Sequence, residues 1–133
     1  MEKQKQESLF YQKLKSSFPE WNFLRIENIC GRGTPDLFCG VRGYFDIWVE
    51  LKALPSTNVQ IRGDQFAFLL EHGQYLNTPC WVWNGDYKKD VFTGWRWPFQ
   101  IGEGRKGHVK ITSAPNIVCP LSKIKTDLKP WQH

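Results

Sequence analysis

Residues 33–52 read Gly-Thr-Pro-Asp-Leu-Phe-Cys-Gly-Val-Arg-Gly-Tyr-Phe-Asp-Ile-Trp-Val-Glu-Leu-Lys. This stretch predicts two short strands, 36–40 and 44–52, joined by the turn Val-Arg-Gly into an antiparallel hairpin. Side chains of a strand alternate between its two faces, so Glu50 and Lys52 share one face. The other face carries an unbroken apolar row, namely Phe45, Ile47, Val49 and Leu51. A carboxylate and an ammonium group at the end of an otherwise buried strand indicate a functional site.

Asp36 supplies a second carboxylate, on the neighbouring strand of the same hairpin. Two converging carboxylates form a hard-oxygen site that suits Mg²⁺, with Mn²⁺ as a substitute. The backbone carbonyl of Leu51 is a further candidate ligand, because its side chain is committed to the core. An ion there would lower the pKa of a bound water and stabilise a leaving oxygen. Lys52 is placed to hold or deprotonate the attacking water, or to stabilise the transition state.

Either half of this pattern is weak alone, since Pro-Asp is a common turn dipeptide and Glu-x-Lys a common exposed strand pattern. Their combination, between apolar strands and ahead of a helix, favours a functional site. The elements expected around the hairpin are a helix over 2–18, a strand over 21–30, a loop over 53–61, a helix over 62–74 and a strand over 80–85. Pro19 ends the first helix, Gly73 is expected to end the second, and Asn84-Gly85 the last strand. The order αβββαβ predicts an α/β fold with a mixed central sheet flanked by helices.

Two polar residues on these helices have two interpretations each. Glu7 is either a solvated acid favoured by the dipole of the first helix, or an acid that points at the site. Gln65 is either a capping residue that reaches back to the backbone, or a polar group aimed at the site.

The remaining residues, 86–133, form an aromatic and basic C-terminal extension. Trp95-Arg96-Trp97-Pro98-Phe99 either stacks on unpaired bases or covers the sheet as a hydrophobic lid. Residues 102–107 predict a basic turn between short strands, with 108–112 as an edge strand, and the tail predicts an extended or short helical segment. We expect one domain, 1–133, whose core spans about 7–85.

Composition narrows the function classes. Of 133 residues, 41% are hydrophobic and 15% aromatic, enough for a core, and the net charge of +5 favours a polyanionic partner. The widely spaced Cys30, Cys39, Cys80 and Cys119 indicate reduced, mostly buried thiols. Since the first residues lack an apolar secretory segment and no apolar run is long enough to span a membrane, we expect a cytoplasmic protein, in the host cytoplasm if viral.

Three motifs together resemble the PD-(D/E)XK nuclease superfamily: Gly33-Thr34-Pro35-Asp36, Val49-Glu50-Leu51-Lys52 and Arg62-Gly63-Asp64-Gln65. The chain looks most like the small single-domain VRR-NUC and Holliday-junction-resolvase-like phage enzymes, over residues 7–83. The resemblance implies a restriction-endonuclease-like core in which Asp36 and Glu50 bind the metal and Lys52 is catalytic. Gln65 would match a glutamine of the VRR-NUC branch, and Glu7 an acid of the first helix. The Gly-Pro often found after the motif lysine is replaced by Ala53-Leu54-Pro55.

The resemblance implies a Mg²⁺-dependent DNA endonuclease that hydrolyses a phosphodiester by in-line attack of water and leaves a 5′-phosphate. Branched DNA is the expected substrate, DNA recombination the expected process and a homodimer the expected assembly. The candidate phosphate contacts are Arg25, Arg32, Arg42 and Arg62. The alternative is a non-catalytic nucleic-acid-binding or regulatory protein that retains the nuclease fold. Scattered histidines give no zinc site, and the lack of a Gly-x-x-x-x-Gly-Lys-Ser/Thr loop argues against a nucleotide cofactor.

Overall fold

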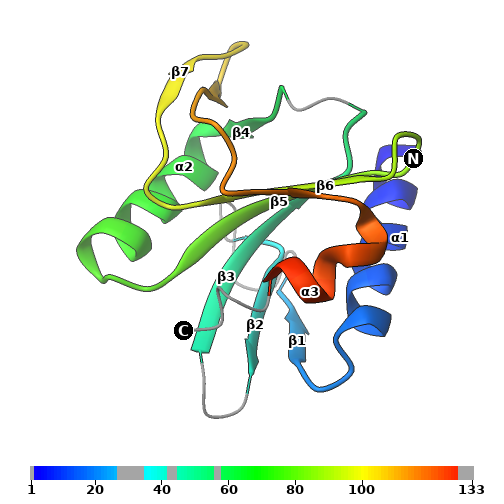
Figure 1. Cartoon of the computed structure of the whole chain (residues 1–133). Coiled ribbons are helices and arrows are strands. Elements are labelled where there is room, and N and C mark those ends of the chain that lie inside the picture. Colours follow the sequence, from blue (N-terminus) through cyan, green and yellow to red (C-terminus); the bar gives the residue numbers. More distant parts are fainter. Residues whose placement is uncertain (1, 27–34, 42–44, 56–57, 129–133) are drawn as a thin grey trace.

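The computed structural model describes residues 2–26, 35–41, 45–55 and 58–128 (Figure 1). Its strands form a six-stranded sheet in the order β1-β2-β3-β5-β6-β9 and a three-stranded sheet in the order β4-β8-β7. In chain order the elements are α1 (Glu2–Ser17), β1 (Asn22–Arg25), β2 (Leu37–Val41), β3 (Phe45–Lys52), β4 (Gln60–Arg62), α2 (Gly63–Leu69), the π-helical η1 (Leu70–Tyr75), β5 (Cys80–Asp86), β6 (Val91–Arg96), β7 (Ile101–Glu103), β8 (His108–Ile111), β9 (Ile117–Cys119), the 3₁₀-helical η2 (Leu121–Lys123) and α3 (Ile124–Leu128).

The main sheet is mixed, as the sequence predicts. β2 and β3 pair antiparallel with Leu37 opposite Val49, which confirms the predicted hairpin. β3 and β5 pair parallel with Lys52 opposite Asn84, and the crossover between them contains β4, α2 and η1. β3 therefore lies inside the sheet, with β2 paired to one of its edges and β5 to the other.

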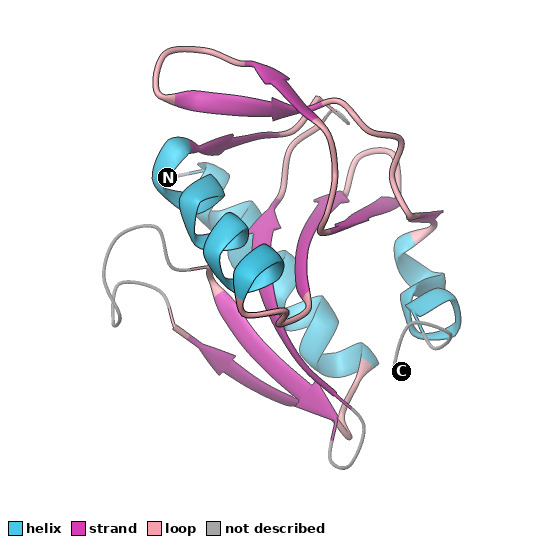
Figure 2. Cartoon of the chain, turned by 90° about the vertical axis from the view of Figure 1, so that its left-hand side faces the viewer, coloured by secondary structure: helices cyan, strands magenta, loops and turns pink. Residues whose placement is uncertain are grey.

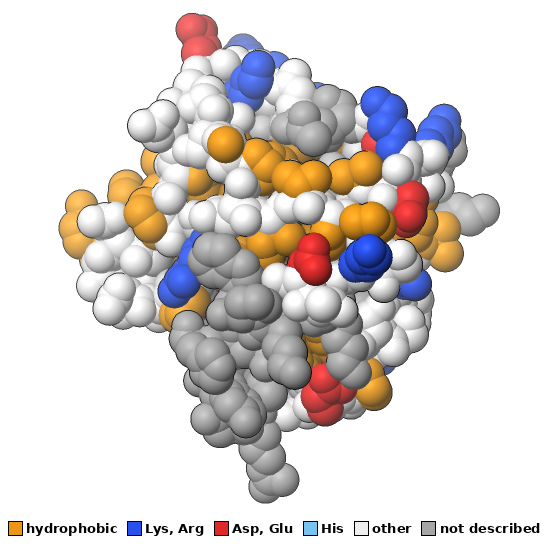
Figure 3. All heavy atoms as spheres, in the orientation of Figure 1, with side chains coloured by type: hydrophobic (Ala, Val, Ile, Leu, Met, Phe, Trp, Pro, Cys, Tyr) orange, Lys and Arg blue, Asp and Glu red, His pale blue; other side chains and the backbone are white. Residues whose placement is uncertain are grey.

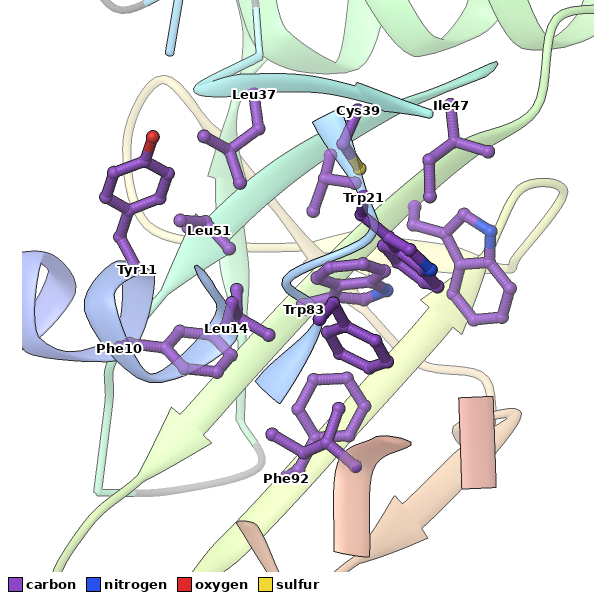
Figure 4. Packing of buried hydrophobic residues seen from close by; sticks show 14 of the residues in the cluster. Phe10, Tyr11, Leu14, Trp21, Leu37, Cys39, Ile47, Leu51, Trp83 and Phe92 are labelled. Carbon is purple, nitrogen blue, oxygen red and sulfur yellow. The ribbon is translucent and has the colours of Figure 1, made fainter. Parts of the chain in front are cut away.

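One face of the main sheet packs against α1 and α3. Phe10, Leu14 and Phe18 recur at the helical spacing that gives α1 one apolar stripe, and all three are fully buried. They belong to one core cluster with Ile47, Val49 and Leu51 of β3 and with Trp83 of β5 (Figure 4). The alternation predicted for β3 is confirmed, because Ile47, Val49 and Leu51 are buried in this cluster.

The opposite face packs against α2 and the three-stranded sheet (Figures 1 and 2). A second core cluster fills this side, made of Val59, Ile61, Leu69, Cys80, Val82, Trp95, Phe99 and Ile111. Trp48 packs against this cluster, and alternation along β3 places Glu50 and Lys52 on the same side as Trp48. Glu50 and Lys52 therefore face α2, whereas α1 covers the other side of the sheet.

The second helix runs past its predicted end. The helical chain continues through Gly73 to Tyr75, and the left-handed backbone follows at Asn77 (φ 57°). Asparagine tolerates this conformation, so it can end a helix as glycine does. Gly73 has another reason to be glycine, because a Cβ atom there would clash with the indole ring of Trp97.

Three further strand predictions need correction. β8 is the central strand of the three-stranded sheet rather than an edge. The expected loop over 53–61 already contains the start of β4, whose three residues are too few to show a period. β5 continues through Asn84-Gly85 to Asp86 because β6 pairs with it from Trp81 to Asp86.

The C-terminal residues enter the main sheet through β6 and β9. Trp95 is only 2% exposed and its indole N–H donates to the Ser113 carbonyl. Trp95 and Phe99 belong to the second core cluster and Trp97 packs against it, so this aromatic segment packs on the α2 side of the main sheet, in agreement with its interpretation as a hydrophobic cover. Cys39, Cys80 and Cys119 are buried thiols, and Cys30 lies outside the described residues. None of the described helices is long and apolar enough to cross a membrane.

Candidate active site

Glu50 is the most buried acid of the candidate site. It lies on the α2 side of the interior strand β3, and only 3% of its surface is exposed. One oxygen, Oε2, lies 3.3 Å from the Lys52 Nζ and accepts a 2.6 Å hydrogen bond from the Gln65 side-chain amide. Lys52, on the same face of β3, and Gln65, on α2, thus both contact the same oxygen of Glu50.

Gln65 performs both of the tasks that the sequence left open. Its Oε1 accepts the backbone N–H of Arg62 at 2.9 Å, which caps the first turn of α2. Because a backbone N–H can only donate, this contact fixes the amide orientation and turns its NH₂ group toward Glu50. The contact with the Arg62 N–H therefore holds the Gln65 NH₂ group in place beside Glu50, and the Gln65 side chain is buried.

Asp36 precedes β2 and reaches the same strand end as Glu50. Its Oδ2 accepts the backbone N–H of Leu51 at 2.8 Å. Its carbonyl accepts the N–H of Ile26 at 2.8 Å, which anchors the residue to the end of β1. Because Leu37 pairs with Val49, the preceding Asp36 lies alongside Glu50. The hairpin thus brings the two predicted carboxylates together.

The pKa of Glu50 is raised from 4.5 to about 8. Burial is the largest cause, because a charged carboxylate loses its hydration, and the negative charge of Asp36 adds to it. The ammonium group of Lys52 lowers the pKa of Glu50 but does not offset burial. Without a further positive charge, Glu50 is therefore mostly protonated at neutral pH.

The donor set fits a divalent cation. The second oxygen of Glu50, Oε1, is buried and has no hydrogen-bond partner among the described residues. An unsatisfied buried oxygen of this kind costs about 1–3 kcal/mol, which a cation would recover. The described residues contain no group of three His, Cys, Asp or Glu side chains able to hold a metal. Asp36 and Glu50 would therefore need a carbonyl, such as that of Leu51, and water to complete the shell.

Asn84 supports the site and was missed by the sequence interpretation. It lies opposite Lys52 on β5, 2% exposed. Its Oδ1 accepts the N–H of Leu54 at 2.9 Å, and its Nδ2 donates to the Leu54 carbonyl at 3.1 Å. These two hydrogen bonds fix the position of Leu54 in the segment that follows Lys52. The available signal was a lone amide in the apolar run Cys-Trp-Val-Trp-Asn.

Glu7 lies on α1, the helix that covers the opposite face of the sheet from Glu50. The start of α1 and the segment after Lys52 nevertheless line the same cavity, whose volume is about 400 Å³. Its lining consists of Gln6, Ala53, Leu54, Pro55, Asp86, Tyr87 and Lys88. A role for Glu7 at the strand end stays a prediction.

The four candidate arginines differ in position. Arg62 precedes α2, with its Nε 3.1 Å from Asp64 Oδ1. Arg25 on β1 places its guanidinium 4.9 Å from the ring centre of Tyr11. Arg32 and Arg42 lie outside the described residues. Arg62 is connected to the Glu50 carboxylate through Gln65, which accepts the Arg62 N–H and donates to Glu50.

Comparisons with known proteins identify the fold. No protein-family model and no curated protein sequence matches the chain. Its structure is similar to that of Hjc, a Holliday junction resolvase from the hyperthermophilic archaeon Archaeoglobus fulgidus, with a TM-score of 0.54 and 14% sequence identity. The similarity covers 81% of this chain and 84% of Hjc. The predicted α/β fold is therefore confirmed: the fold of this chain is similar to that of the Hjc resolvase.

Proposed function

We propose that the protein is a Mg²⁺-dependent DNA endonuclease whose site consists of Asp36, Glu50, Lys52 and Gln65. The observation that carries this proposal is the Glu50 carboxylate, buried with one oxygen held by Lys52 and Gln65 and the other without a partner among the described residues. The fold shared with Hjc supports a nuclease, because Hjc is a Holliday junction resolvase.

The residues divide the work by chemistry. Asp36 and Glu50 would hold the cation, with the Leu51 carbonyl as a third protein ligand. A bound Mg²⁺ would supply Lewis acidity and lower the pKa of a coordinated water. Lys52, whose ammonium group lies 3.3 Å from Glu50 Oε2, would orient the attacking water or contact the phosphate in the transition state. Gln65 would keep Glu50 in its orientation through the 2.6 Å hydrogen bond.

The finer assignment is a phage-type VRR-NUC nuclease that forms a homodimer and prefers branched DNA. Gln65 supports the VRR-NUC branch, because it sits on the helix after Glu50-Leu51-Lys52 and contacts the acid of that motif. The name of the structural neighbour, a Holliday junction resolvase, supports a branched substrate. Glu7 would contribute a further acid, and Arg25, Arg32, Arg42 and Arg62 would contact phosphates.

A cleavage assay tests the proposal. Plasmid, linear and four-way-junction DNA are incubated with Mg²⁺, Mn²⁺ or EDTA and with wild type, Asp36→Ala or Lys52→Ala. We expect cutting that needs the metal and falls at least about 100-fold in both variants. Glu20→Ala and Lys15→Ala, at exposed positions away from the site, are the matched controls and should cut as wild type does.

The same assay decides against the rival function. A wild-type protein that binds DNA but cuts none of the three substrates with either metal would be a non-catalytic DNA-binding protein. Cutting that survives in Asp36→Ala would place the activity elsewhere in the chain or in a contaminant.

A further inference from the structure

The three-stranded sheet presents a basic outer face that the proposed catalytic site does not use. Side chains of β4 and β8 alternate, so Ile61 and Ile111 turn into the second core cluster with Val109 packed against it. Arg62 pairs with His108 and Gln60 with Lys110 in the register, and these four residues share the opposite, outer face. The β7–β8 turn adds two exposed cations, Arg105 and Lys106.

This face carries a net positive charge. Its cations are Arg62, Arg105, Lys106 and Lys110, and Asp64 pairs with Arg62. Glu103 lies opposite Val109, so alternation turns it to the other side of the sheet. Figure 3 shows Lys and Arg side chains, together with an acidic side chain, at the end of the molecule where Figure 1 places β7.

The basic turn is anchored rather than loosely attached. The Gly63 N–H, at the start of α2, donates to the Gly107 carbonyl at 2.9 Å. The Arg105 N–H donates to the side-chain Oε1 of Gln60 at 2.9 Å. Gly104 permits this contact, because a Cβ atom there would lie 2.6 Å from the same Oε1. The turn is therefore fixed to β4 and to the first turn of α2.

The anchoring places the basic face next to the candidate active site. β4 leads directly into α2, and Arg62, the last residue of β4, donates its N–H to Gln65, which in turn donates to Glu50. A chain of two hydrogen bonds thus connects the basic face with the buried carboxylate. A phosphate backbone that reaches Glu50 on the α2 side of the main sheet would pass beside this face.

We propose that the outer face of the β4-β8-β7 sheet binds the phosphate backbone of duplex DNA next to the cleavage position. The inference deepens the nuclease proposal and rests on it for the location of the cut. The face carries cations without Phe, Tyr or Trp among its residues 60, 62, 102, 104–108 and 110. Such a composition suits phosphate contacts rather than stacking on the bases of a single strand.

Salt-dependent binding tests this face without catalysis. Fluorescence anisotropy measures the Kd for labelled duplex DNA in EDTA between about 50 and 200 mM salt. The test variant is Lys106→Ala/Lys110→Ala. Because each lost phosphate contact removes about 0.9 from the slope of log K against log salt, we expect the slope to fall by about 1.8 and the affinity to drop about tenfold or more.

The matched control is Lys15→Ala/Lys123→Ala, which removes two lysines exposed on the other face of the main sheet. It should keep the wild-type slope, and Lys106→Arg/Lys110→Arg should keep it too, because the charge remains. Thermal melting of each variant shows that the fold is intact. An equal fall in slope in the control, or no fall in the test variant, would overturn the proposal. So would a larger loss of binding to single-stranded DNA or duplex RNA than to duplex DNA.

Cleavage in the same preparations separates this proposal from the nuclease proposal. If wild type binds duplex DNA through this face and never cuts, the basic face stands and the nuclease assignment fails. If wild type cuts and the test variant binds and cuts as wild type does, the nuclease stands and the basic face fails.

Discussion

At the scale of single residues, Glu50 determines how the site responds to its surroundings. Its carboxyl group is buried, faces the negative charge of Asp36 and has one positive neighbour, Lys52. Burial outweighs that neighbour and the pKa rises to about 8. The consequence is a folded state that binds one more proton than the unfolded state over a wide pH range.

This proton predicts a stability that falls as pH rises in EDTA. The folded pKa of Glu50, about 8, exceeds the reference value of 4.5, so ionisation weakens the fold between these two pH values. Each pKa unit corresponds to about 1.4 kcal/mol, which makes the total loss a few kcal/mol. Urea unfolding at a series of pH values measures it. Glu50→Gln should remove most of this slope, while the exposed control Glu71→Gln should not; an unchanged slope in Glu50→Gln would contradict the assignment.

Gln65 predicts a second residue-scale effect, on stability rather than on pH. Gln65→Ala removes the acceptor of the Arg62 N–H and the donor to Glu50. Because both partners are left without that contact, the free energy of unfolding should drop by about 1–3 kcal/mol. Gln65→Glu keeps an acceptor for Arg62 but loses the donor to Glu50. Denaturant unfolding checks both, with exposed Gln74→Ala expected within about 0.5 kcal/mol of wild type.

At the scale of elements, the position of α2 depends on how η1 packs against the chain after β6. Gly73 of η1 lies directly against the Trp97 indole ring, and Phe66 of α2 lies 5.7 Å from the same ring, centre to centre. The helix that presents Gln65 is therefore held at its far end by an aromatic residue of the C-terminal segment.

This packing predicts that the effect of a substitution at Gly73 on stability depends on Trp97. Gly73→Ala should destabilise the fold by about 1–3 kcal/mol, because its methyl group would clash with Trp97. In a Trp97→Ala background the same change should cost little, since the ring is gone, and a double-mutant cycle of unfolding free energies measures the difference. The matched control is Gly63→Ala, whose Cβ would meet its nearest atom only at 3.7 Å. Equal costs in both backgrounds would show that the clash is relieved elsewhere.

At the scale of the whole molecule, a cation at Asp36 and Glu50 would stabilise the complete fold. A ligand that binds only the folded state at tenfold above its Kd adds about 1.4 kcal/mol. Mg²⁺ or Mn²⁺ should therefore raise the melting temperature by several degrees. Asp36→Asn should lose this response, and NaCl of equal ionic strength should not reproduce it. A wild-type melting temperature indifferent to both metals would argue against the metal site, independently of any cleavage assay.

The sequence by itself determined the central hairpin and the face that carries its charges. Strand side chains alternate with a period of two, so Glu50 and Lys52 had to share a face opposite Val49 and Leu51. The turn between two nearby strands brought Asp36 to the same end. These are local consequences of the chain, and they were predictable for that reason.

Only the tertiary structure decided which distant groups meet this hairpin. Gln65 reaches Glu50 because α2 packs on that face of the sheet, and Asn84 meets Leu54 because β5 pairs in parallel with β3. β4 is three residues long and pairs with β8 more than forty positions later, so the alternation of side chains within β4 is too short to predict the pairing. Pairings of this kind follow from the packing of apolar faces across the whole chain, which sequence patterns within one segment do not specify.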